Sequence, residues 1–203
     1  MRTFLFDIDG TLVDSAAVVE RVWRQVAREF GGDERAVLSN SHGRVDADVA
    51  RDFFRPEQAA AILARVSELD LATMDGVAAI PGAAETLAAL RPDQWAAVTS
   101  GGRRLMSGRL RTAGLPLPRV LVSADDVTRG KPDPEGYLAA AAALGAAPEH
   151  CVVVEDSPAG VAAGRAAGAL VVAVTTTHDP AALGAADIVI ADLRALPADL
   201  LAG

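Results

Sequence analysis

Two aspartates near the N-terminus have the spacing of a metal site. Asp7 and Asp9 follow an apolar run that ends at Phe6, so both carboxylates point to one side at the carboxyl end of a predicted strand. Ligands of open α/β sheets bind at that end, and hard oxygen ligands suit Mg²⁺. A calcium-binding EF-hand loop does not fit, because Gly10 comes too early and Val18 stands where a glutamate is needed.

Two further segments can supply anion-binding groups. Thr99, Ser100 and Gly101 come between a predicted strand and a helix, where hydroxyls and free backbone amides bind phosphate oxygens. Lys131 lies in a proline-stiffened loop before another helix, where a fixed ammonium can neutralise a phosphate. Each segment also has a simpler explanation when it is taken alone. Ser100 can be an ordinary helix cap, and Lys131 can be an exposed surface lysine.

A second acidic pair indicates that these groups form one site. Glu155 and Asp156 end a buried run of valines, as Asp7 and Asp9 end the first strand. All four segments follow predicted strands and therefore reach one edge of one sheet. Together they provide carboxylates for a metal, donors for phosphate oxygens and a cation.

Six short apolar runs predict the strands that must position these groups. They are bounded by turn signals, and they show little alternation of polar and apolar residues, as in a parallel sheet covered on both faces. The predicted strands are Arg2–Phe6, Trp95–Val98, Val120–Val122, Cys151–Val154, Leu170–Val174 and Ile188–Ile190. Helical segments lie between them, which predicts an α/β fold with a Rossmann-like doubly wound parallel sheet.

The stretch after the first strand breaks this alternation. Apolar residues recur there at helical spacing without an intervening strand. The first helical stripe consists of Val18, Val22, Val26 and Phe30. We predict a small α-helical cap domain at residues 15–79, inserted into a core domain of residues 1–14 and 80–203.

The composition excludes several classes of protein. The 203 residues are 51% hydrophobic and 23% charged, as in globular proteins. Nineteen basic residues stand against 27 acidic ones, so we expect neither nucleic acid nor an anionic membrane surface as a partner. No apolar run reaches the ~20 residues of a membrane span, and none near the N-terminus is typical of a signal peptide. We expect a cytoplasmic monomer.

Four segments together resemble the motifs of the haloacid dehalogenase superfamily. They are Asp-Ile-Asp-Gly-Thr-Leu-Val-Asp-Ser from Asp7, the strand end at Thr99, Gly-Lys-Pro-Asp-Pro from Gly130, and Val-Val-Glu-Asp-Ser-Pro-Ala-Gly from Val153. The order and spacing match, and the resemblance covers nearly the whole chain. The segment Gly130–Gly168 and the later Thr175-Thr176-Thr177 most resemble the branch of sugar phosphatases, glycerol-1-phosphatases and β-phosphoglucomutases. This implies a Mg²⁺-dependent phosphatase for small phosphorylated sugars or polyols, which works through an aspartyl-phosphate.

The resemblance implies roles for the residues of the site. Asp7 would be the nucleophile, and Asp9 would be the general acid for the leaving alcohol and then the base for water. Thr99, with the backbone amides of Ser100 and Gly101, would bind phosphoryl oxygens.

The same resemblance implies the cation and its ligands. Lys131 would neutralise the nucleophile and the phosphate. Mg²⁺ would be held by Asp7, the backbone carbonyl of Asp9 and Asp156, with Glu155 either a ligand or a partner that supports the ligands.

Two residues of the predicted cap resemble a substrate-binding loop. His42 and Arg44 are expected to contact substrate, although His42 fits a structural loop histidine equally well. A β-phosphoglucomutase would have a histidine at Val19, and Thr11 is typical of the phosphatases, so hydrolysis is favoured over the mutase reaction. A broad-specificity phosphatase for phosphoglycolate or nucleotides and a non-catalytic binder of phosphorylated ligands remain as alternatives.

Overall fold

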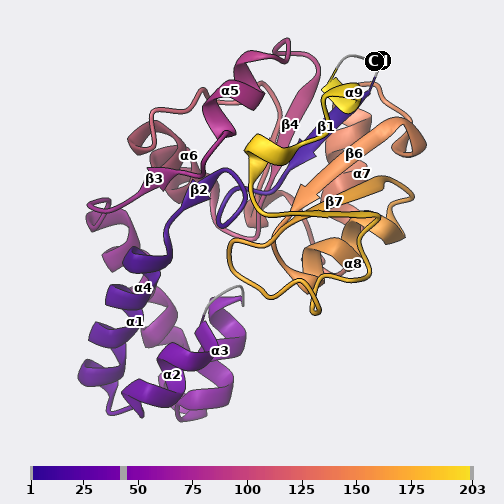
Figure 1. The fold of residues 1–203 in the computed structure, drawn as a ribbon. Coiled ribbons are helices and arrows are strands. Elements are labelled where there is room, and N and C mark those ends of the chain that lie inside the picture. Colours follow the sequence, from indigo (N-terminus) through magenta and orange to yellow (C-terminus); the bar gives the residue numbers. More distant parts are fainter. Residues whose placement is uncertain (1, 42–44, 202–203) are drawn as a thin grey trace. The chain divides into compact units, whose positions relative to one another are not determined.

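The computed structural model describes residues 2–41 and 45–201, and its ribbon is drawn in Figure 1. The chain divides into two compact units, which are described separately. One consists of Met1–Asp14 with Ala78–Gly203, and we call it the core unit. The other is Ser15–Val77, and we call it the helical unit.

A parallel sheet forms the centre of the core unit. Among the described residues it has six strands in the order β5-β4-β1-β6-β7-β8, and all neighbours pair in parallel. The strands are β1 Thr3–Phe6, β4 Trp95–Val98, β5 Leu121–Val122, β6 Cys151–Glu155, β7 Leu170–Val174 and β8 Ile188–Ile190. The order reverses between β1 and β6, as expected for a doubly wound sheet. The predicted fold class is confirmed, and each predicted strand end lies within one residue of the observed one.

Two very short strands were not predicted. β2 (Val13–Asp14) and β3 (Ala78–Ala79) pair antiparallel where the chain leaves and re-enters the core unit. Strands of two residues show no periodicity, so the sequence carries no signal for them.

Helices of the core unit follow the strands. The α-helices are α5 Ala83–Ala88, α6 Arg103–Thr112, α7 Glu135–Ala143, α8 Pro158–Ala166 and α9 Ala198–Leu201. Short 3₁₀ turns, η2 Ala124–Asp126, η3 Pro148–His150 and η4 Leu193–Ala195, complete the connections. The start of α8 shows why these boundaries could be predicted, because Pro158 occupies the first turn and the Ser157 hydroxyl accepts a hydrogen bond from the Gly160 amide at 3.1 Å.

The helical unit contains α1 Ala16–Phe30, α2 Glu34–Ser41, α3 Asp46–Phe53, η1 Pro56–Gln58 and α4 Ala59–Ala72. The valines of the α1 stripe are buried and Phe30 is half-buried. Trp23 belongs to the same interior, where its ring centre lies 6.2 Å from that of Phe54. An ion pair between Arg65 and Glu29 at 2.8 Å joins α4 to α1 on the outside. None of the helices in the described ranges has both the length and the apolar character needed to cross a bilayer.

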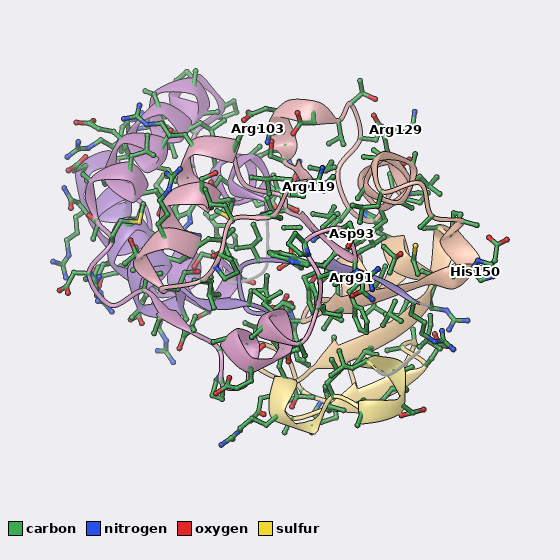
Figure 2. The ribbon with its side chains drawn as sticks, turned by 90° about the horizontal axis from the view of Figure 1, so that it is seen from above. Arg91, Asp93, Arg103, Arg119, Arg129 and His150 are labelled. Atoms are coloured by element: carbon green, nitrogen blue, oxygen red, sulfur yellow. The ribbon has the colours of Figure 1, made fainter. Side chains whose placement is uncertain are left out.

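Charged side chains cover the outside of the protein. Figure 2 labels several exposed ones, namely Arg91, Asp93, Arg103, Arg119, Arg129 and His150. Their ion pairs are mostly local, such as Arg91 with Asp93 at 3.1 Å and Arg129 with Asp133 at 2.6 Å. Exposed pairs of this kind contribute little to stability, because water competes for both charges.

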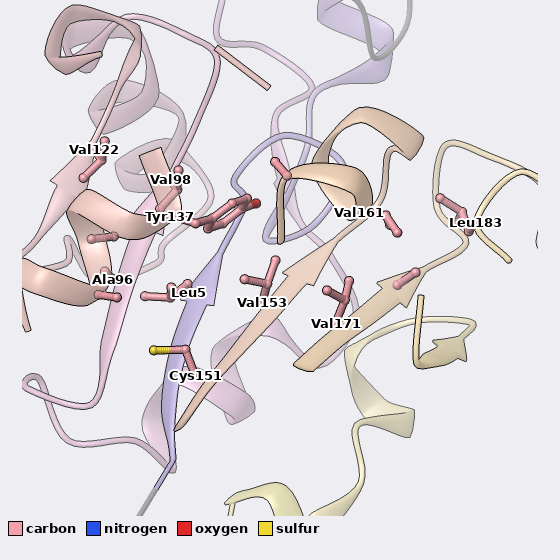
Figure 3. Packing of buried hydrophobic residues seen from close by; sticks show 14 residues of the cluster. Leu5, Ala96, Val98, Val122, Tyr137, Cys151, Val153, Val161, Val171 and Leu183 are labelled. Atoms are coloured by element: carbon pink, nitrogen blue, oxygen red, sulfur yellow. The ribbon is translucent and has the colours of Figure 1, made fainter. Parts of the chain in front are cut away.

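The core of the core unit lies between the sheet and helices α7 and α8. Figure 3 shows Leu5, Val153 and Val171 from adjacent strands packed beneath Tyr137 of α7 and Val161 of α8. Alternation along β1 sends the neighbouring Phe4 and Phe6 to the opposite face of the sheet, where their rings stack at 5.7 Å. Both faces of the central strands are therefore buried, which explains their uniformly apolar sequences.

This packing predicts a large cost for a small deletion in β6. Val153 is fully buried, and Val153→Ala removes two methyl groups from a site that cannot collapse. We expect the free energy of unfolding to fall by about 2 kcal/mol in urea titrations. Val189→Ala is the matched control on β8, where the residue is 39% exposed, and it should change the free energy of unfolding by less than about 0.5 kcal/mol. Equal effects of the two substitutions would contradict this description of the core.

Candidate active site

The residues with predicted chemistry gather at the carboxyl ends of three adjacent strands. β1 lies between β4 and β6, and Phe6 is in register with Ala97 on one side and Val154 on the other. Asp7, the next residue after β1, is therefore flanked by the end of β4, where Thr99 follows, and by the end of β6, where Asp156 follows.

Lys131 enters this edge from the loop before α7. Its ammonium contacts the carboxylate of Asp7, lies 2.5 Å from Oε1 of Glu155 and donates to the Val98 carbonyl at 3.3 Å. It also lies 5.4 Å from the centre of the Tyr137 ring. Only 11% of the Lys131 side chain is exposed, so the alternative of a surface lysine is wrong. Burial alone would lower the pKa of this ammonium, but the Asp7 and Glu155 carboxylates raise it above its ordinary value.

Glu155 is a fully buried carboxylate surrounded by donors. Its Oε1 accepts from the Tyr137 hydroxyl at 2.8 Å. Its Oε2 accepts from the Asp156 amide at 3.0 Å and from the Ser157 amide and hydroxyl at 3.1 and 3.0 Å. Burial by itself would raise the pKa of Glu155, but Lys131 and these hydrogen bonds hold it below its usual range. Glu155 is thus a charged anchor that fixes Lys131 and the start of α8.

An acidic cluster surrounds Asp7. Within the part of the chain that the structure describes, Asp7, Glu155 and Asp156 are all buried and each offers an oxygen within 4.8 Å of the other two. Burial and the neighbouring carboxylates raise the pKa of Asp7 well above its usual value, although Lys131 opposes this. The same two causes, burial and then the charge of Glu155, raise the pKa of Asp156 to about 7. The Lys131 ammonium balances part of this negative charge, and a divalent cation bound by the cluster would relieve the remainder.

Hydroxyl groups hold Asp156 in this cluster. The Thr177 hydroxyl donates to Oδ2 of Asp156, and the Thr11 hydroxyl lies 3.5 Å from Oδ1. The Thr176 hydroxyl donates to the Gly10 carbonyl in the loop after β1. Thr177 belongs to the Thr175–Thr177 segment of the family resemblance, but its pairing with Asp156, 21 residues away, could not be predicted from the sequence.

Close packing around the carboxylates of Glu155 and Asp156 requires a glycine beside each of them. A Cβ at Gly160 would lie 1.8 Å from the carboxylate carbon of Glu155. A Cβ at Gly10 would lie 2.2 Å from Oδ2 of Asp156, and Gly10 has a φ of 82°, which other residues rarely adopt. Both glycines therefore belong to the site through the space they leave free.

The predicted phosphate-binding turn follows β4. Thr99 is buried, and its hydroxyl oxygen accepts a hydrogen bond from the Gly101 amide at 3.1 Å, which leaves the hydroxyl proton available for an acceptor. Ser100 is exposed, and α6 begins at Arg103, just past the turn. The Lys131 ammonium, bound to the carbonyl before Thr99, links this turn to the acidic cluster.

Asp9 has a different environment from Asp7. Its carboxylate pairs with the guanidinium of Arg109 on α6, and 32% of the Asp9 side chain is exposed. The sequence carries no signal for Arg109, which is outside all four motifs. The other two predicted site residues, His42 and Arg44, lie outside the residues that the structure describes.

A buried carboxylate cluster with a fixed ammonium beside it, at the carboxyl ends of a doubly wound sheet, is typical of enzymes of phosphoryl transfer. The family model described as haloacid dehalogenase-like hydrolase matches residues 1–168. The chain belongs to this family, as its motifs predicted, and it is a phosphoric monoester hydrolase.

Characterised relatives and a solved structure agree with this assignment. The chain is 43% identical to hexitol phosphatase A of Escherichia coli over 95% of its own length and 92% of that protein. It is 39% identical to validoxylamine A 7'-phosphate phosphatase of Streptomyces hygroscopicus subsp. limoneus, over 95% and 94% of the two chains. A HAD family hydrolase from Deinococcus radiodurans, solved with bound phosphate and sodium, superposes with a TM-score of 0.73 at 36% identity, covering 98% and 95%.

The contacts of Glu155 predict that it is essential for stability. Glu155→Gln keeps the shape but replaces a charged acceptor with a group that cannot pair with all the surrounding donors. We expect the free energy of unfolding to fall by about 3 kcal/mol or more, measured by urea titration. Glu149→Gln is the control at an exposed position, and it should change the free energy of unfolding by less than about 0.5 kcal/mol. A Glu155→Gln protein as stable as the parent would show that the anchor role is wrong.

Proposed function

We propose that this enzyme is a Mg²⁺-dependent phosphatase that hydrolyses phosphorylated sugars or polyols through an aspartyl-phosphate on Asp7. The observation that carries the proposal is the buried acidic cluster with the Lys131 ammonium against its central member. The substrate class is supported by the relatives described above, one a hexitol phosphatase and the other a phosphatase of validoxylamine A 7'-phosphate.

The first half of the reaction uses Asp7 as nucleophile. A carboxylate oxygen of Asp7 attacks phosphorus while the bond from phosphorus to the substrate oxygen breaks. Lys131 holds the attacking carboxylate and neutralises charge on the transferring group. Thr99, with the amides of Ser100 and Gly101, binds phosphoryl oxygens, and Asp9 gives a proton to the leaving alcohol.

The second half regenerates the enzyme. Water attacks phosphorus of the aspartyl-phosphate, and Asp9, now a carboxylate, takes a proton from that water. The bond between phosphorus and the Asp7 oxygen breaks, and inorganic phosphate leaves. Lys131 stays beside Asp7 throughout, because Glu155 anchors it from the other side.

The acidic cluster suits a magnesium ion. Asp7, Asp156 and the backbone carbonyl of Asp9 are the proposed ligands, because hard oxygen donors are what Mg²⁺ prefers. When bound, the ion supplies positive charge that stabilises the phosphoryl oxygens. We assign Glu155 to supporting the ligands, since both of its oxygens already accept hydrogen bonds from the protein.

We propose that the helical unit is the cap that selects the substrate. This function, and the contact of His42 and Arg44 with the part of the substrate that carries no phosphate, follow from the motif resemblance of the sequence. In enzymes with such units, closure of a mobile part over the site excludes water and contributes to specificity.

A substrate panel tests the proposed function. Phosphate release is measured with and without Mg²⁺ on sugar, hexitol, glycerol and nucleotide phosphates and on phosphoglycolate, and Asp7→Asn is measured in parallel. We expect Mg²⁺-dependent release from sugar or polyol phosphates and only background release by Asp7→Asn, because an amide is a poor nucleophile. β-Glucose 1-phosphate is included, and conversion to glucose 6-phosphate without phosphate release would indicate a mutase instead. Normal turnover by a folded Asp7→Asn protein would contradict the mechanism.

The raised pKa of Asp156 predicts how Mg²⁺ stabilises the enzyme at different pH. Without a cation, the folded protein keeps the Asp156 proton up to about pH 7, whereas the unfolded chain loses it near the ordinary value of 3.8. Stability in EDTA therefore decreases as pH rises across this window, because the folded state binds the proton more tightly. Mg²⁺ must displace that proton, so it should raise the melting temperature more at about pH 8 than at about pH 5.5.

Differential scanning fluorimetry checks this dependence, and Asp156→Asn is the control. That variant lacks the titrating group and a proposed ligand, so we expect Mg²⁺ to change its melting temperature little at either pH. An equal Mg²⁺ effect on the parent protein at both pH values would show that Asp156 does not control cation binding.

A further inference from the structure

The ion pair between Arg109 and Asp9 joins two elements that are distant in the sequence. Asp9 follows β1, and Arg109 lies on α6, 100 residues later. Only 3% of the Arg109 side chain is exposed, against 32% for Asp9. The guanidinium is thus held inside the protein, and its carboxylate partner lies partly open to solvent.

Arg109 differs from the arginines on the surface. Of the arginines that the structure describes, Arg109 alone is buried. The exposed Arg91 and Arg129, labelled in Figure 2, pair with acidic residues two and four positions away, as flexible surface side chains commonly do. A buried guanidinium is strongly unfavourable unless it is paired, so Arg109 constrains the position of Asp9 much more than a surface arginine would.

Helix α6 is in turn held against the phosphate-binding turn. A Cβ at Gly101 would lie 2.4 Å from Cε of Met106, which shows how closely the first turns of α6 pack on the turn after β4. Arg109 lies on the same helix, three residues after Met106. Helix α6 therefore connects the turn at Thr99–Gly101, which is expected to bind phosphoryl oxygens, with the guanidinium that contacts Asp9.

We propose that Arg109 is a positioning residue, which orients the Asp9 carboxyl group for proton transfer to and from the reacting oxygens. A guanidinium is planar and presents its donors in a fixed fork, so it restricts the plane and direction of a bound carboxyl group. The observed contact joins a guanidinium nitrogen of Arg109 to Oδ2 of Asp9. A protonated carboxyl group keeps an acceptor oxygen, so the contact can persist in both halves of the reaction.

This inference rests on the proposed function, in which Asp9 is the acid and base. It makes a prediction that a purely structural role of Arg109 does not make. Departure of an alkoxide from an alkyl phosphate needs a proton from the acid, whereas p-nitrophenolate is a stable anion that leaves with little help. Misplacement of Asp9 should therefore slow the reaction of alkyl phosphates selectively.

The test compares kcat/KM for a hexitol or glycerol phosphate with that for p-nitrophenyl phosphate in Arg109→Met. We expect the value for the alkyl phosphate to fall by about 10- to 100-fold and the value for p-nitrophenyl phosphate to stay within about threefold of the parent. Arg109→Lys, which keeps the charge but lacks the planar fork, should recover part of the loss. Arg111→Met is the matched control on an exposed position of α6 and should change neither value.

A double-substitution cycle completes the test. Asp9→Asn alone should show the same selectivity for leaving groups, and adding Arg109→Met to it should cause little further loss, because both changes disable one function. Equal losses on both substrates, no loss, or independent additive effects would each overturn the proposal, while a selective defect in Asp9→Asn leaves the proposed function intact.

Two further results separate the remaining possibilities. If the parent protein releases no phosphate from any substrate, the proposed function itself fails. If Arg109→Met is unfolded in circular dichroism at the assay temperature, the leaving-group comparison is made with Arg109→Lys, for which we expect a selective loss of about threefold or more. An unselective effect in that variant overturns the proposal.

Discussion

The buried ammonium of Lys131 between two carboxylates is the interaction on which the rest of the site depends. Asp7 and Glu155 are both withdrawn from water, and each would be costly to bury as an unpaired charge. Glu155 remains ionised because Lys131, Tyr137 and the start of α8 surround it with donors. That anchor fixes the ammonium, and the fixed ammonium determines the environment of Asp7.

The parallel sheet makes this arrangement possible. Its central strands are buried on both faces, so polar groups are tolerated where the strands end and the backbone turns away. β1 lies between β4 and β6, and this order brings Asp7 next to both neighbouring strand ends. The same topology gives the two basic side chains different partners. Lys131 pairs with Asp7 in the acidic cluster, whereas Arg109 on α6 pairs with Asp9.

The three buried carboxylates of the acidic cluster carry more negative charge than the Lys131 ammonium can balance. Burial and mutual repulsion raise the pKa values of Asp7 and Asp156, although Thr177 and Lys131 oppose the effect at Asp156. A cation bound by this cluster would have to displace the protons that these raised pKa values favour. On the proposed function, proton release and cation binding would therefore be coupled, and both would act on the stability of the folded protein.

The sequence by itself was sufficient to predict the sheet and to place Asp7 and Asp156 at its edge, because those signals are local. A buried strand needs a run of apolar residues, and a residue directly after it must lie at the edge of the sheet. The family resemblance extended this to an expected chemistry. Only the tertiary structure decided which groups lie in contact. Arg109 contacts Asp9, which is 100 residues away in the sequence, and Thr177 contacts Asp156, which is 21 residues away. Such pairs leave no periodic or motif signal, since their partners become neighbours only when the whole sheet and its helices have packed.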